Sequence, residues 1–207
     1  MASSRIGNAV LLVALILLST TARSEESECA IVYGKNWAFL FSAPKSWKVD
    51  CPIQNPSGIV VALWPEGTTF ANAPGIMYVT VSQKNSFSLE KFAEDELARF
   101  REQSPNLQVE LSNSIALPNK SKALVRKLTG DQFGNHELIA YVDGGTVYLI
   151  LVLSSRTQES FEHLRSAFGE FVSSIQPMNI KFGNAEKPPQ STPEGKQHDK
   201  AVQQPSP

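Results

Sequence analysis

Few residues in this 207-residue chain have types and spacing that could do chemistry together. His136 and Glu137 begin a near match to the H-E-x-x-H zinc pattern, but Ala140 stands where the second histidine is needed. The surrounding residues are typical of a strand, whereas this zinc site needs two histidines one helical turn apart. His163 and His198 lie far along the chain. We therefore predict no catalytic, cofactor-binding or metal-binding residues.

The densest acidic group is Glu94, Asp95 and Glu96. Paired carboxylates can serve as general acid and base. These three, however, lie in a predicted helix that also carries Lys91 and Arg99, and acids and bases at this spacing form ion pairs on a solvated helix face. The pattern favours an ordinary exposed surface over a reactive pair.

The chain has two cysteines, Cys29 and Cys51. Two such residues in an exported protein are typical of a structural disulfide, and a bridge across about twenty residues stabilises a fold by about 3 kcal/mol. A redox motif would have the thiols about three residues apart, and a zinc site would have four ligands. We therefore predict a Cys29–Cys51 bridge.

The first 24 residues are typical of a cleavable signal peptide. Arg5 precedes an apolar run of ten residues from Ala9 to Leu18, about half the length needed to cross a bilayer. Small residues follow, and cleavage after Ala22 or after Ser24 is compatible with them. We expect export to the periplasm or the exterior, with no stable membrane insertion afterwards.

Net charge excludes some partner classes. A mature chain starting at Glu25 has lost two arginines, which leaves 17 basic against 20 acidic residues and a net charge of about −3. Nucleic acids and anionic membranes select for a basic excess, so neither is an expected partner. At the other end, residues 183–207 hold one large apolar residue, Val202. Such a segment is typical of a disordered tail, which leaves one domain over residues 28–180.

The elements of this domain follow from hydrophobic spacing. Apolar residues with strand character occupy 31–41, 59–64, 76–82, 107–117, 123–128, 136–142 and 146–153, and Asp143-Gly144-Gly145 predicts a hairpin between the last two. Apolar residues at helical spacing predict helices after Ser88 and after Thr157, each residue a plausible N-cap. The expected class is α+β, with a mainly antiparallel sheet of about six to seven strands packed with two amphipathic helices.

Several segments resemble the PsbP-like domains of bacterial cell envelopes. They are FSAPKSW (41–47), IMYVTV (76–81), SLEKFAEDEL (88–97), VYLILVLSS (147–155) and FEHLRSAFGEFVSSI (161–175). The class is named after the extrinsic subunit P of photosystem II and shares its fold with a nuclear import factor that binds the GTPase Ran. The resemblance covers about residues 37–176 and implies an α/β/α sandwich whose relatives mostly bind other proteins.

The resulting expectation is an exported, non-enzymatic protein-binding or assembly-accessory module of a bacterial envelope, with no cofactor and another envelope or secreted protein as partner. Two alternatives stay open. One is a small-ligand-binding protein or hydrolase with a pocket between sheet and helices, and the other is a secreted effector or inhibitor. A ten-residue polar loop from Glu66 to Gly75 is the strongest candidate for an interaction surface. The tryptophans that border the early strands, Trp37, Trp47 and Trp64, favour closing the edges of the core. The alternative interpretation is a partner-binding edge formed by Trp47, Trp64 and Phe70.

Overall fold

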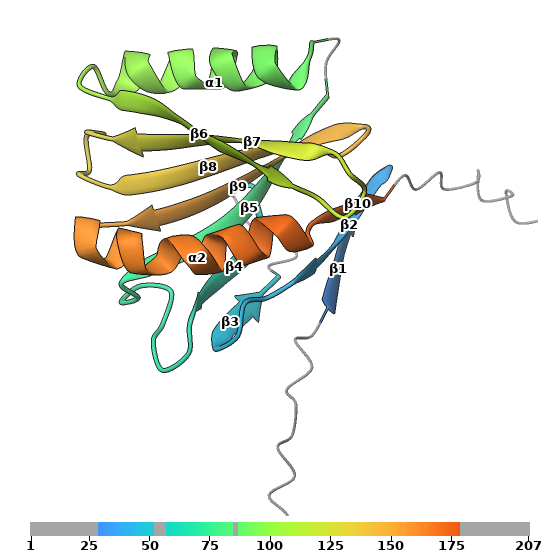
Figure 1. Cartoon of the computed structure of the whole chain (residues 1–207), viewed down its shortest axis with the longest axis horizontal. Coiled ribbons are helices and arrows are strands. Elements are labelled where there is room, and N and C mark those ends of the chain that lie inside the picture. The colour runs from blue at the N-terminus through green and yellow to red at the C-terminus, as the bar shows by residue number, and fades with distance from the viewer. Residues whose placement is uncertain (1–28, 52–56, 85–86, 179–207) are drawn as a thin grey trace, which may run out of the picture.

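The computed structural model describes residues 29–51, 57–84 and 87–178, and within them it shows ten strands and two helices (Figure 1). The predicted signal peptide and the predicted tail over residues 183–207 lie outside the described residues. The elements in chain order are β1 (Cys29–Gly34), β2 (Trp37–Ser42), β3 (Trp47–Asp50), β4 (Ile59–Pro65), β5 (Gly75–Gln83), α1 (Leu89–Gln103), β6 (Gln108–Ala116), β7 (Lys122–Thr129), β8 (His136–Asp143), β9 (Val147–Ser155), α2 (Gln158–Ser174) and β10 (Gln176–Met178).

The strands form two sheets. The large sheet has seven strands in the order β3-β4-β5-β9-β8-β7-β6, and the small sheet has the order β1-β2-β10. Every neighbouring pair in both sheets is antiparallel. The predicted α+β class with a mainly antiparallel sheet and two helices is confirmed. The central pairing is β5 with β9, which brings together residues that are more than 60 positions apart in the chain.

Two cores lie on the two faces of the large sheet. Phe161, Phe168 and Phe171 of α2 pack on one face, together with β2 of the small sheet. Phe92 and Leu97 of α1 pack on the other face. Neighbouring residues on β8 and β9 point alternately to these two cores. Their apolar runs are continuous because both faces are covered, and the result is the expected α/β/α sandwich.

The two helices begin at the predicted residues. The Ser88 hydroxyl accepts a hydrogen bond from the backbone N–H of Lys91, and the Thr157 hydroxyl accepts one from Ser160, so both predicted N-caps are confirmed. No helix in the described part of the chain combines the length and the apolar character that crossing a membrane requires.

Three short strands were not predicted. Residues 31–41 form the hairpin of β1 and β2 in place of one strand, with Asn36 in the left-handed region at a φ of 67°. Asparagine tolerates this conformation better than most residues, which suits a tight turn. Strands β3 and β10 have four and three residues, too few for alternation to show in the sequence. They exist because β4 and β2 offer unpaired backbone groups at their edges.

Candidate functional site

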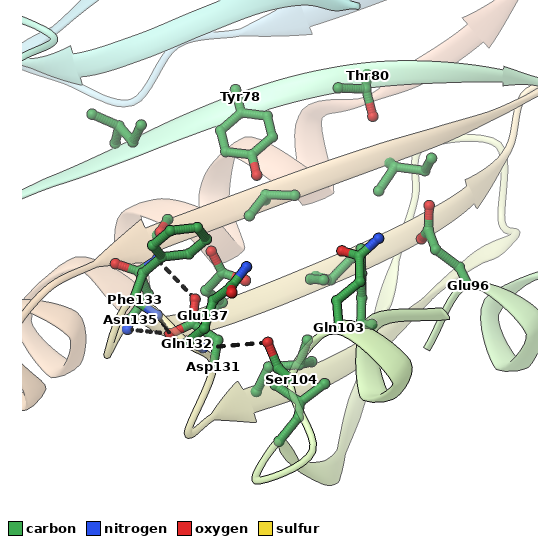
Figure 2. A pocket seen from close by; sticks show the side chains of 18 of the residues that line it. Tyr78, Thr80, Glu96, Gln103, Ser104, Asp131, Gln132, Phe133, Asn135 and Glu137 are labelled. Atoms are coloured by element: carbon green, nitrogen blue, oxygen red, sulfur yellow. Dashed lines mark hydrogen bonds between the residues drawn. The ribbon is translucent and has the colours of Figure 1, made fainter. Parts of the chain in front are cut away.

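A cleft of about 550 Å³ lies between α1 and the face of the large sheet that α1 covers. We call it the α1 cleft. Its apolar lining consists of Ile59, Ile76, Phe100, Leu107, Leu128, Phe133, Ile139, Ile150 and Val152. Figure 2 shows its polar side chains, with Tyr78 and Thr80 directed inward from β5, Glu96 reaching from α1 and Glu137 coming from β8. The cleft therefore combines an apolar floor with a few converging polar groups, as ligand sites commonly do.

Two carboxylates of this cleft are largely removed from water. Burial raises the pKa of Glu96, and the Tyr141 hydroxyl and the Arg99 guanidinium lower it only in part. Burial also raises the pKa of Glu137, which the Ser154 hydroxyl lowers in part and the Asp131 carboxylate raises further. Desolvation dominates in both cases because a charge loses its hydration without gaining a full counter-charge.

Two tyrosines lie close enough to both carboxylates to interact with them electrostatically. The pKa of Tyr78 is raised first by burial and then by the charges of Glu137 and Glu96, so its hydroxyl lies within the field of both. Tyr141 is fully buried on β8, and its hydroxyl lies close enough to the Glu96 carboxylate to lower the pKa of Glu96, but the contact falls short of hydrogen-bond geometry among the described residues. The Oε2 atom of Glu96 is buried and unpartnered within the same residues. A ligand donor that reached Glu96 would give this oxygen a hydrogen bond of good geometry, which Tyr141 does not supply.

The wall opposite Tyr78 is a braced loop between β7 and β8. The Asp131 carboxylate accepts hydrogen bonds from the backbone N–H groups of Phe133, at 3.1 Å, and Asn135, at 2.7 Å, and from the Asn135 side-chain amide at 2.9 Å. The backbone N–H of Gln132 donates to the Ser104 hydroxyl at 3.3 Å, which ties the loop to the end of α1. These bonds hold the loop against the helix, so this wall of the cleft is preformed.

The three consecutive acidic residues of α1 do not all lie on the exposed helix face that the sequence predicts. Asp95 forms the expected ion pair with Lys91, and Glu94 is exposed. Glu96 instead lines the α1 cleft. The sequence analysis did not identify Glu96 or Glu137 as site residues. The one sequence feature that could have indicated them is that each acid stands directly beside an apolar residue of the core. His136 begins a strand, as expected, and its ring packs against Phe161 at 6.0 Å between centroids. The described residues include no group of three His, Cys, Asp or Glu side chains able to hold a metal ion.

The structure brings two of the three predicted edge residues together. Trp64 and Phe70 meet edge to face with ring centroids 6.0 Å apart, and Phe70 is 43% exposed. Trp47 instead packs against the α2-side core. It lies beside Pro65 in the register of β3 and β4, so it points to the opposite face from Trp64.

The structure does not test the predicted disulfide. Cys51 is exposed and unpaired among the described side chains, and the side chain of Cys29 lies outside them. The backbone places Cys29 at the start of β1 in the small sheet and Cys51 directly after β3 in the large sheet. The bridge stays a prediction, and it would join the two sheets.

Comparisons with solved structures return proteins of similar architecture. Cyanobacterial PsbP from Synechocystis is 16% identical, with 78% of this chain and 99% of that chain covered and a TM-score of 0.47. LpqN of Mycobacterium tuberculosis, described as involved in cell envelope biogenesis, is 11% identical, with coverage of 72% and 90% and a TM-score of 0.46. A Pseudomonas aeruginosa protein described as a putative regulator is 11% identical, with coverage of 73% and 99% and a TM-score of 0.45.

The structural neighbours thus include a PsbP, the class that the sequence resembles. No protein-family model and no curated protein sequence matches the chain. These identities and TM-scores are too low to transfer a function to this chain. Its chemistry is therefore inferred from its own side chains.

Proposed function

We propose that this chain is an exported, non-enzymatic binding module that holds a small organic cation in the α1 cleft. The observation that carries the proposal is the pair of desolvated carboxylates, Glu96 and Glu137, in a cleft whose described lining has no Lys, Arg or His. An ammonium group beside either carboxylate would supply counter-charge that the described lining lacks. The apolar floor would take the alkyl part of the ligand, because burying it removes apolar surface from water.

Two nearby arginines offset this negative field only in part. Arg99 is exposed on α1 and lowers the pKa of Glu96 less than burial raises it. Arg126 lies close enough to act on Tyr141, but its guanidinium donates a hydrogen bond of 3.1 Å to the backbone carbonyl of Val125. Neither arginine lines the cleft. An incoming cation therefore meets the carboxylates of Glu96, Glu137 and Asp131 and no competing positive side chain in the described lining.

The test is calorimetric titration of the purified protein with hexylammonium, hexanol and hexanoate, which share one apolar body and differ in charge. Hexylammonium is expected to bind with one site, hexanol at least 10-fold more weakly and hexanoate more weakly still. Affinity for hexylammonium is expected to rise with pH above the ordinary carboxyl range, because the raised pKa values delay ionisation of Glu96 and Glu137.

Variants identify the groups responsible. The double variant Glu96→Gln, Glu137→Gln is expected to lose at least 10-fold in hexylammonium affinity and to keep its affinity for hexanol. Glu94→Gln is the matched control, because it removes the same charge from an exposed position on the same helix. Equal binding of all three compounds, or an equal loss in the control, would contradict the proposal. Turnover of a bound compound into a product would contradict its non-enzymatic part.

The location outside the cytoplasm is part of the same proposal and rests on the signal-peptide pattern of residues 1–24. Mass spectrometry of the protein recovered from its host is expected to show a mature chain that begins at Arg23 or Glu25. Recovery of the uncleaved chain from the cytoplasm would exclude export.

A second candidate function is docking of a partner protein at the aromatic pair of Trp64 and Phe70. The half-exposed ring of Phe70 on Trp64 favours it, since aromatic side chains are common anchors at protein interfaces. Crosslinking in the host envelope is expected to capture one defined partner with the unmodified chain and to lose it with Phe70→Ala. Leu111→Ala is the control, because Leu111 is also an exposed apolar residue but lies on β6. Loss of the partner in both variants, or in neither, would rule this candidate out.

A further inference from the structure

The two glutamates of the α1 cleft lie at two separate places along strand β8. Glu96 lies beside Tyr141, which is on this strand. Glu137 is four residues earlier on the same strand, and four residues of extended backbone span about 13 Å. Figure 2 shows the two glutamates on different sides of the cleft, with Gln103 between them. Glu96 therefore marks one end of the cleft and Glu137 marks the other.

Each end of the cleft has its own electrostatic neighbours. Besides burial, the groups that act on the pKa of Glu96 are Tyr141 and Arg99. Burial raises the pKa of Glu137 most, and the acid that raises it further is Asp131 and not Glu96. A single ammonium at one end therefore leaves the carboxylate at the other end without a counter-charge. A desolvated carboxylate without a counter-charge is unfavourable, so a second positive group adds to binding.

The floor between the two ends is apolar. Ile139 stands between Glu137 and Tyr141 on β8 and points to the same face of the sheet as both. Ile150 and Val152 of β9 pair with Tyr141 and Ile139 and line the same part of the floor. A methylene chain laid over these residues would remove apolar surface from water.

Hydrogen-bonding capacity is also available at the two ends. At one end, the Oε2 atom of Glu96 and the hydroxyl of the fully buried Tyr141 complete no hydrogen bond of good geometry within the described residues. At the other end, the Asp131 carboxylate already accepts three hydrogen bonds from its own loop, which leaves Glu137 as the acid that meets a ligand. An ammonium N–H donates to a carboxylate in a charge-assisted bond, about twice as strong as a neutral one.

We infer that the ligand of the α1 cleft is a linear alkyl diamine, held by Glu96 at one terminal ammonium and by Glu137 at the other. This inference rests on the proposed function, because it fills the same cation site and adds a second ammonium to its ligand. The apolar floor takes the methylene chain. An acid at each end, with no positive side chain in the described lining, selects a ligand with two positive ends over a ligand with one.

The test is calorimetric titration of the purified protein with diaminobutane, diaminohexane, diaminooctane and diaminodecane, whose amino groups are at the two chain ends. Each diamine is compared with its mono-acetylated form, which keeps the chain and loses one charge. At the best chain length, the free diamine is expected to bind at least 10-fold more tightly than its acetylated form. The two equivalent ends of a diamine account for only a twofold statistical advantage.

Two single variants locate the two ends of the ligand. Glu96→Gln and Glu137→Gln are each expected to reduce the advantage of the free diamine to the statistical twofold, because each variant keeps only one of the two binding carboxylates. Glu94→Gln is the control, since it removes the same charge from an exposed position on α1 and is expected to keep the full advantage. Loss of the advantage in only one of the two variants, or in the control as well, would overturn the assignment of the ends.

The outcomes separate this inference from the proposed function. If hexylammonium binds but no diamine gains more than twofold over its acetylated form, the diamine inference is overturned and the cation site stands. If hexylammonium and the diamines all fail to bind, both are overturned.

Discussion

At the scale of single residues, the informative groups are acids placed where water is scarce. Glu94, Asp95 and Glu96 are consecutive, yet only Glu96 faces the sheet. Consecutive residues on a helix point about 100° apart, so one step along the chain separates Asp95, which pairs with Lys91 at the surface, from Glu96, which lines the cleft. Glu137 reaches the same cleft from β8. A buried acid without a full counter-charge reduces stability, and functional sites are where such acids are commonly retained.

Replacement of Glu96 is expected to change how stability depends on pH. Because its pKa is raised in the folded state, the native carboxyl keeps its proton over a range in which the unfolded chain has lost it. Stability is therefore lost as pH rises from the ordinary carboxyl pKa through the raised one. Glu96→Gln is expected to have the melting temperature of the unmodified protein near pH 4 and a higher one near pH 8, measured by circular dichroism. A melting temperature that is lower at both pH values would show that the carboxylate is stabilising, against this expectation.

At the scale of elements, α2 is held to the sheet by close packing. A side chain at Gly75 would begin 2.5 Å from the Leu164 Cδ1 atom and 3.1 Å from the backbone oxygen of Ser154. The absence of a side chain at the start of β5 therefore lets the first half of α2 approach the sheet. Gly169 lies later on the same helix and has open space around it. The two glycines differ in packing and not in backbone conformation, since neither has a positive φ.

The two glycines are expected to respond in opposite directions to alanine. Gly75→Ala is expected to lower the free energy of unfolding by about 1–3 kcal/mol, because overpacking forces α2 or β9 to shift. Gly169→Ala is expected to raise it by about 0.5–1 kcal/mol, because alanine favours a helix interior. Urea unfolding of the two variants beside the unmodified protein measures both changes. A stabilising Gly75→Ala would show that Leu164 rotates away at little cost.

At the scale of the whole molecule, the question is how the small sheet is attached to the large one. Strand β2 contributes Phe39 and Phe41 to the α2-side core, and Phe41 meets Phe171 of α2 edge to face at 5.6 Å. The Ser174 hydroxyl accepts a hydrogen bond from the backbone N–H of Ser42 at 3.0 Å. The small sheet thus packs mainly on α2, and the predicted Cys29–Cys51 bridge would add a covalent link to the large sheet.

Reduction of that bridge is expected to lower the free energy of unfolding by about 3 kcal/mol, the chain-entropy value for a loop of this length. The intact mass of the exported protein is expected to be about 2 Da below the value for two free thiols, the mass of the two hydrogens lost on oxidation. Unfolding in urea with and without reductant measures the energy. Cys51→Ser is the control, since its stability should not respond to reductant. Two thiols that react freely in the oxidised protein would show that the bridge does not form.

The sequence by itself determined the elements that are long and periodic. Leu89, Phe92 and Leu97 repeat at helical spacing, and apolar and aromatic residues follow Thr146 without interruption to Leu153, so the sequence predicts helix α1 and strand β9 nearly to their ends. Such patterns are local, because each records which side of an element faces the core. The N-caps and the β8–β9 hairpin were predicted for the same reason, since capping and turn preferences act over a few residues.

Only the tertiary structure decided what shares the α1 cleft. Glu96 and Glu137 are 41 positions apart in the chain, and Tyr78 stands between them because β5 pairs with β9 and β9 with β8. No local pattern encodes these strand pairings, because they depend on how the seven strands assemble into one sheet. The same holds for Trp47 and Trp64, which look alike in the sequence but point to opposite faces of the sheet. Burial turned two ordinary-looking acids into a candidate site, and burial is a property of the assembled fold.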